Sequence, residues 1–178
     1  MRVLDVLVAG GLLIVLSPVY LVVYVLVQIM MGRPAIFKQA RPGLKGKPFM
    51  VQKFRTMMNQ THDADGNRLS DAERTPKLGH LLRKTSLDEL PQLVSVVKGD
   101  MSLVGPRPLL MEYLPKYTPE QMRRHEMRPG ITGWAQVNGR NNTKFSERFQ
   151  MDVWYVDNWS LKLDAVIMLK TIKRVLKG

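Results

Sequence analysis

The sequence predicts a helix-rich α+β protein whose N-terminus enters a membrane as a re-entrant helix-break-helix. Three observations support this class: a long apolar N-terminal segment, a pair of short β-compatible runs that could form a small β-hairpin, and amphipathic helical periodicity near the C-terminus. They divide the 178 residues into a membrane-embedded segment over residues 1–33 and one compact domain over residues 34–178. A domain of that size can bury a core of its own.

The first element is the apolar segment from Val3 to Met31, which is almost entirely Val, Leu, Ile, Met and Gly. It is long enough for a helix of about 20 residues, which crosses a hydrocarbon core of roughly 30 Å. Ser17 and Pro18 interrupt it near its middle, because proline removes a backbone hydrogen bond and the Ser17 hydroxyl can bond the freed carbonyl. Basic residues flank both ends. A hairpin that returns to the cytoplasmic face satisfies both ends, and a proline-kinked single span is the alternative.

Short elements follow in the next sixty residues. The runs Ala35 to Gln39 and Phe49 to Phe54 are β-compatible and predict a hairpin with a rather long loop. The polar stretch from Asn59 to Pro76 predicts an exposed loop. Apolar residues at helical spacing then predict two short helices, Leu78 to Thr85 and Leu87 to Lys98.

A strand and two punctuated loops come next. Met101 to Val104 predicts a strand, and the rigid loop Gly105-Pro-Arg-Pro108 follows it. A second loop, Arg128-Pro-Gly-Ile-Thr-Gly133, combines glycines with an arginine. Glycines let backbone N–H groups approach a ligand, so this composition suits a nucleotide diphosphate, although neither loop is a Walker or dinucleotide motif.

The C-terminus predicts a basic amphipathic helix. Trp154, Tyr155 and Trp159 precede it, and aromatic residues commonly lie at the level of lipid headgroups. This pattern is typical of an interfacial helix, and a helix packed on the domain's own core with solvated lysines is the alternative. The apolar stripe consists of Leu161, Ala165, Met168, Leu169, Ile172, Val175 and Leu176.

Composition narrows the classes of partner. The chain has 27 basic and 15 acidic residues, for a net charge of +12, and no cysteine. Such a charge suits nucleic acid, anionic lipid or a phosphorylated substrate. The lack of cysteine excludes disulfides and thiolate chemistry. The aromatic residues do not interleave with a basic stripe and no recognised nucleic-acid motif occurs, which argues against a nucleic-acid partner.

The candidate chemistry lies in Ser86-Leu-Asp-Glu-Leu-Pro-Gln92 and in the loop that contains Arg107. The adjacent carboxylates Asp88 and Glu89 can hold a divalent cation and offer one oxygen as a nucleophile. A nearby arginine can bind a phosphate through its bidentate fork. These residue types together indicate phosphoryl transfer.

The same residues have a structural interpretation. Ser86 and Glu89 match a capping box, in which the serine hydroxyl bonds the backbone N–H of the glutamate. Pro91 complicates this interpretation, because it disfavours helical geometry in the residue before it. We therefore expect the regular helix to begin around residues 88–90, so that one carboxylate could cap it while the other points outward.

Taken in order, the motifs resemble the small monotopic phosphoglycosyl transferases of bacteria, also called the bacterial sugar transferase family. The resemblance covers essentially the whole chain. Each motif is weak alone, but the ordered set is highly specific. The set comprises Ser17-Pro18, Gln39-Ala-Arg-Pro-Gly43, Lys53-Phe-Arg-Thr-Met57, Ser86-Leu-Asp-Glu-Leu-Pro-Gln92, Lys98-Gly-Asp-Met101, Gly105-Pro-Arg-Pro108 and Arg128-Pro-Gly-Ile-Thr-Gly133.

The resemblance implies transfer of a phosphosugar from a UDP-sugar to undecaprenyl phosphate, which gives undecaprenyl-diphospho-sugar and UMP. It implies that Asp88 attacks the β-phosphorus to form a phosphosugar-aspartate, and that Glu89, with Asp88, holds Mg²⁺. The metal and arginines would neutralise the diphosphate, which otherwise repels a carboxylate nucleophile. The candidates for phosphate binding are Arg107 first, followed by Lys53, Arg83 and Arg128.

The resemblance also implies a location in the bacterial inner (cytoplasmic) membrane, with the catalytic domain on the cytoplasmic face. The phospholipid membrane and downstream glycosyltransferases of glycan biosynthesis are then candidate partners. From the residues alone, a membrane phosphatase or pyrophosphatase with Asp88 as nucleophile stays open. A basic membrane-tethered binding protein and a purely structural anchor are the non-enzymatic alternatives.

Overall fold

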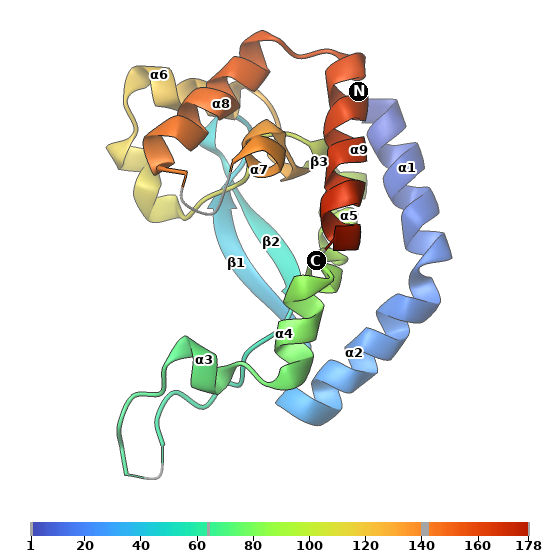
Figure 1. The fold of residues 1–178 in the computed structure, drawn as a ribbon, viewed down its shortest axis with the longest axis vertical. Coiled ribbons are helices and arrows are strands. Elements are labelled where there is room, and N and C mark those ends of the chain that lie inside the picture. The colour runs from blue at the N-terminus through green and yellow to red at the C-terminus, as the bar shows by residue number, and fades with distance from the viewer. Residues whose placement is uncertain (1, 64, 140–142, 178) are drawn as a thin grey trace.

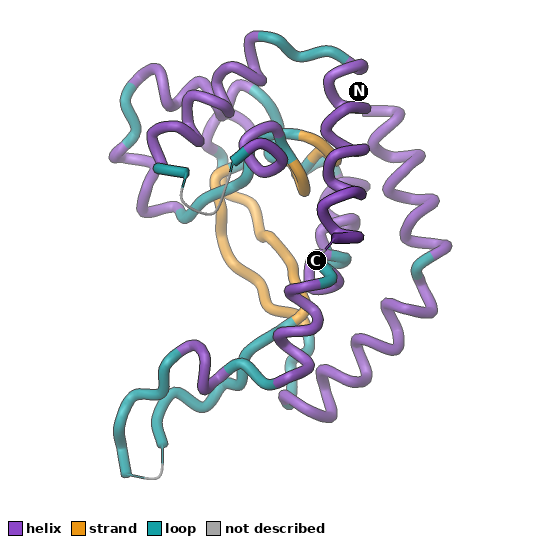
Figure 2. The backbone as a smooth tube through the Cα atoms, in the orientation of Figure 1, coloured by secondary structure: helices purple, strands orange, loops and turns teal. Residues whose placement is uncertain are grey.

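The computed structural model describes residues 2–63, 65–139 and 143–177, and within them helices predominate over strands (Figure 2). The predicted helix-rich α+β class is confirmed. The α-helices are α1 Arg2–Val15, α2 Ser17–Met31, α3 Asp71–Arg74, α4 Lys77–Lys84, α5 Gln92–Lys98, α6 Pro119–Met122, α7 Trp134–Asn138, α8 Phe145–Asp157 and α9 Leu161–Lys177. The 3₁₀ turns are η1 Leu44–Gly46, η2 Leu87–Glu89, η3 Met111–Lys116 and η4 Arg123–Glu126. The strands are β1 Ile36–Pro42, β2 Pro48–Phe54, β3 Ser102–Val104 and β4 Gly130–Thr132.

The apolar N-terminal segment forms two helices, as predicted, and they are bent by 64° at the break between α1 and α2 (Figure 1). Pro18 has no N–H for the carbonyl of Ile14, and the Ser17 hydroxyl donates to that carbonyl instead, at 2.8 Å. Among the described residues no single helix is long and apolar enough to cross a bilayer, whereas the bent pair has the necessary length and composition together. A re-entrant path and a kinked span both remain compatible with this geometry.

The N-terminal end of α1 packs into the core of the rest of the chain. Asp5 is buried, and its carboxylate accepts hydrogen bonds from the Ser102 hydroxyl at 2.8 Å and from the Leu103 N–H at 3.2 Å. Ala9 is fully buried in a cluster with residues of α5, β3, α8 and α9, including Ile167. The helix α1 and the chain after residue 33 therefore share one core.

The predicted hairpin is confirmed. Strands β1 and β2 pair antiparallel from Ile36 opposite Phe54 to Pro42 opposite Pro48, and η1 lies in the loop that joins them. The predicted exposed loop after it extends away from the body of the molecule and includes the short helix α3 (Figure 1). The first of the two predicted short helices is confirmed as α4.

A second small sheet differs from the prediction. The predicted strand before Gly105 is confirmed as β3, but the glycine-rich stretch after Arg128 contains a strand, β4, which pairs parallel with β3. The glycines serve this pairing. A Cβ atom added to Gly130 would lie 2.1 Å from the Gly105 nitrogen, so the two backbones could not approach with larger residues.

The C-terminal helix α9 packs on the domain's own core, which was the alternative interpretation. One face packs on the core: Ile167 is fully buried, and the Asp164 carboxylate accepts from the Tyr155 hydroxyl at 2.6 Å. Leu161, Leu169 and other apolar residues on another face remain exposed. The core contact is thus established, and contact of the exposed face with a membrane stays a prediction.

Candidate active site

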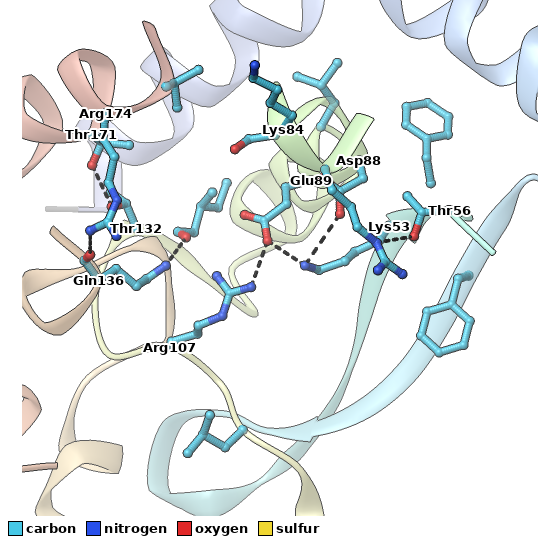
Figure 3. A pocket seen from close by; sticks show the side chains of 18 of the residues that line it. Lys53, Thr56, Lys84, Asp88, Glu89, Arg107, Thr132, Gln136, Thr171 and Arg174 are labelled. Carbon is cyan, nitrogen blue, oxygen red and sulfur yellow. Dashed lines mark hydrogen bonds and ion pairs between the residues drawn. The ribbon is translucent and has the colours of Figure 1, made fainter. Parts of the chain in front are cut away.

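An open cavity of about 1340 Å³ lies between the hairpin, η2, the loop after β3, and helices α7, α8 and α9. Asp88, Glu89, Lys53 and Arg107 all line it and lie close together (Figure 3). The structure thus brings the principal predicted residues into one cavity from three separate parts of the chain.

The turn that presents the two carboxylates is not a helix cap. Ser86 has a φ of 57°, in the left-handed region, and its side chain makes no capping hydrogen bond. A capping serine needs extended backbone geometry, so the capping-box interpretation is wrong. The regular helix begins at Gln92, with Pro91 immediately before it, rather than at residues 88–90. Asp88 and Glu89 therefore lie in the separate 3₁₀ turn η2, and neither is used as a cap.

The two carboxylates have different partners. Oε1 of Glu89 receives Nζ of Lys53 at 2.5 Å and Nη2 of Arg107 at 2.9 Å. The Asp88 carboxylate lies 3.9 Å from Lys53 Nζ, and no hydrogen bond joins it to another side chain or N–H in the described part of the chain. Glu89 is thus engaged with two cationic side chains, whereas Asp88 keeps its oxygens available.

The pKa values of the two carboxylates also shift in opposite directions. Burial raises the pKa of Asp88 above its ordinary value, and the neighbouring Glu89 charge raises it further, against opposing effects of Lys53 and Arg107. Burial also acts to raise the pKa of Glu89, but Arg107 and Lys53 together lower it below its ordinary value. Glu89 therefore remains ionised, and Asp88 is the more basic carboxylate of the two.

The remaining predicted phosphate-binding residues fall into two groups. Arg83 lines the cavity, and its Nε donates to the Thr56 hydroxyl at 2.9 Å. Arg128 does not line it, since its Nε donates to the Gly99 carbonyl at 2.9 Å, at the end of α5. The structure therefore brings Arg83 to the candidate site and leaves Arg128 outside.

Several cavity-lining cations were not predicted from the sequence. Lys84, Arg124, Arg148 and Arg174 also line the cavity. They occur in polar helical segments that look like ordinary solvated surface, so neither periodicity nor motif spacing distinguishes them. Proximity in the fold is the signal that identifies them.

The residues suit a magnesium site whose coordination a substrate would complete. No group of three or more potential ligands among His, Cys, Asp and Glu occurs in the described residues. Mg²⁺ is commonly bound by one or two carboxylates together with substrate phosphates, rather than by a cage made of protein alone. The neighbouring carboxylates of Asp88 and Glu89 match that donor set.

Comparison with known proteins gives the class to which this fold and site belong. Residues 1–178 match the family described as bacterial sugar transferase, and the chain belongs to that family. The predicted family and the predicted transferase class are thereby confirmed, and the non-enzymatic alternatives are set aside.

Individual relatives sharpen the comparison. A Bacillus subtilis (strain 168) protein named uncharacterized sugar transferase EpsL is 55% identical over 175 residues, which are 98% of this chain and 86% of the relative. A Caulobacter vibrioides protein named UDP-glucose:undecaprenyl-phosphate glucose-1-phosphate transferase is 40% identical over 187 residues, or 98% of this chain and 69% of the relative. An Escherichia coli (strain K12) protein of the same name is 39% identical over 177 residues, or 94% of this chain but 38% of the relative.

Proposed function

We propose that this protein transfers a phosphosugar from a UDP-sugar to undecaprenyl phosphate or a similar polyprenyl phosphate. The observation that supports this most directly is the pairing of a buried but uncommitted carboxylate, Asp88, with a neighbour, Glu89, that holds two cations in the same cavity. The names of the Caulobacter and Escherichia relatives support the nature of donor and acceptor.

In the first proposed step, an Asp88 oxygen attacks the β-phosphorus of the donor. The bond from that phosphorus to the bridging oxygen breaks, and UMP leaves with the electron pair. Arg107 and Lys53 lie where they can bind the diphosphate oxygens, which reduces the repulsion between the incoming carboxylate and the anionic substrate. The product on the enzyme is a phosphosugar-aspartate.

In the second step, a phosphate oxygen of the lipid attacks the same phosphorus. The bond to Asp88 breaks, the free carboxylate returns, and a polyprenyl-diphospho-sugar forms. Raising the pKa of Asp88 by burial favours the first attack, because a more basic carboxylate is a better nucleophile.

Mg²⁺ is the proposed cofactor, held by Asp88 and Glu89 with substrate phosphate oxygens. When bound, it would neutralise charge on the diphosphate. Lys53 and Arg107 orient the Glu89 carboxylate and so keep it deprotonated for that role.

The proposed location is the inner (cytoplasmic) membrane, with the N-terminus and the catalytic domain both on the cytoplasmic face. The break at Ser17-Pro18 and the docking of Asp5 on β3 support a re-entrant path, since both ends of the segment then adjoin the same domain. Val3 is exposed, and the chain has no cysteine, so Val3→Cys allows labelling of the N-terminus from either side. Labelling from the periplasmic side would contradict the re-entrant path.

The decisive experiment measures UMP release from a panel of UDP-sugars, with and without polyprenyl phosphate. With acceptor, we expect continuous UMP release and a lipid-linked sugar. Without it, we expect a burst of about one UMP per enzyme, because the phosphosugar remains on Asp88. Continuous release of UMP and free sugar phosphate without acceptor would instead identify a pyrophosphatase.

A further inference from the structure

Arg124 lies in the wall of the active-site cavity, at the junction of η4, α8 and the loop that contains Arg107. Its side chain is 2% exposed, and that of its partner Asp152, which it meets at 2.6 Å, is 4% exposed. Nη1 donates to the Tyr117 hydroxyl at 2.9 Å, and the guanidinium lies 5.2 Å from the centre of the Phe149 ring. The guanidinium is therefore fixed on several sides by protein groups.

The same guanidinium holds the backbone of the phosphate-binding loop. Nη2 of Arg124 donates to the main-chain carbonyl of Arg107 at 2.7 Å. Earlier in that loop, Gly105 N–H donates to the Thr132 carbonyl at 2.9 Å, and the Pro106 carbonyl accepts from Gly130 N–H at 3.1 Å. These two contacts join backbone to backbone at Gly105 and Pro106. At Arg107 itself, the loop backbone is held by the side chain of Arg124.

We propose that Arg124 is the positioning residue that aims Arg107 at Glu89 and at the donor diphosphate. In this assignment it acts through Arg107, because its guanidinium, although in the cavity wall, is 2% exposed and bonds Asp152, Tyr117 and the Arg107 carbonyl. This inference rests on the phosphate-binding role proposed for Arg107. Its geometric basis is independent of that role: a hydrogen bond to the Arg107 carbonyl fixes the backbone from which the side chain extends.

The test is a double-mutant cycle with Arg124→Lys and Arg107→Lys, read as kcat and KM for the UDP-sugar. Lysine keeps a positive charge beside Asp152 but lacks the planar fork that reaches several acceptors at once. We expect kcat/KM to fall about 10- to 100-fold in Arg124→Lys, the change that follows from loss of one charge-assisted hydrogen bond, mostly through a higher KM. In the Arg107→Lys background, the same substitution should change kcat/KM less than threefold.

A purely structural role would give a different pattern. If Arg124 acted only on stability, Arg124→Lys would lower the Tm equally in the unaltered protein and in Arg107→Lys. It would then also reduce kcat/KM by the same factor in both, and that result would overturn the assignment. Unaltered kinetics in Arg124→Lys would overturn it as well. Absence of UDP-sugar turnover in the unaltered protein would instead show that the proposed function itself is wrong.

Two further variants guard against misfolding and general effects. Tyr117→Phe removes one acceptor of Arg124 while leaving the contact to Arg107, and we expect a smaller loss, about threefold, that again disappears in the Arg107→Lys background. Arg123→Lys is the matched control. Arg123 is the adjacent arginine, but it pairs at the surface with Glu120 and Asp157, and we expect unchanged kinetics.

Discussion

Of the arginine–carboxylate clusters in the described residues, the one around Arg124 and the one around Arg107 differ in what their charges are free to do. In the support cluster, Arg124 and Asp152 have side chains 2% and 4% exposed. In the active-site cluster, Arg107 and Glu89 are 44% and 17% exposed, and Asp88 beside them has no hydrogen-bond donor of its own among the described residues. The same residue types thus build a scaffold where both charges are buried against each other, and a reactive site where one carboxylate remains free for a ligand.

The largest expected effect is a loss of turnover, and it distinguishes Asp88 in the active site from Asp152 in the support cluster. Asp88→Asn removes the nucleophile, so turnover should fall by at least about 10⁴-fold, with UMP release as the measurement. Stability should change little, because Asp88 is a desolvated charge that makes no hydrogen bond within the described residues and whose ion pair with Lys53 is long, at 3.9 Å. Substantial residual turnover would remove Asp88 from the nucleophile role.

The matched change in the support cluster should act on stability instead. Asp152→Asn leaves the buried Arg124 guanidinium without its counter-charge, which should lower the free energy of unfolding by about 3 kcal/mol. Denaturant titration of the detergent-solubilised protein measures this. An unchanged denaturation midpoint would show that the buried pair is not the support that its geometry indicates.

Arg107→Lys tests the cationic side chain of the active-site cluster. It keeps the charge but loses the fork, so kcat/KM for the UDP-sugar should fall about 10- to 100-fold if the diphosphate contact is bidentate. Stability should be nearly unaffected, since the side chain is 44% exposed. Normal kinetics would transfer the principal phosphate-binding role to Arg83 or Lys53.

These clusters also show what a sequence can and cannot indicate. The break at Ser17-Pro18 was predictable because its chemistry is local: a proline, a hydroxyl and a carbonyl within one helical turn. The hairpin was predictable for the same reason, since its strands follow each other along the chain, although the connection over residues 43–47 is shorter than the rather long loop predicted. The adjacent carboxylates indicated phosphoryl chemistry by residue type alone.

Features that depend on distant contacts were not predictable. The parallel pairing of β3 with β4 joins residues 28 positions apart, such as Ser102 and Gly130, and the intervening chain gives no periodic signal for it. The left-handed Ser86 was missed because serine at that spacing ordinarily caps a helix. Arg124 was missed because a buried arginine is identified by its partners, which lie elsewhere in the chain.

The smallest expected effect concerns pH, and it tests whether the active-site charges tune one another. Asp88 must be ionised to attack, so activity should decline as pH falls through its pKa, which lies above the ordinary value of an aspartate. Lys53 lowers that pKa and Glu89 raises it. Lys53→Met should therefore move the acid limb of kcat/KM to higher pH, and Glu89→Gln should move it to lower pH, although both variants also lose rate. If the acid limb moves in the same direction in both variants, it belongs to another group, such as the acceptor phosphate.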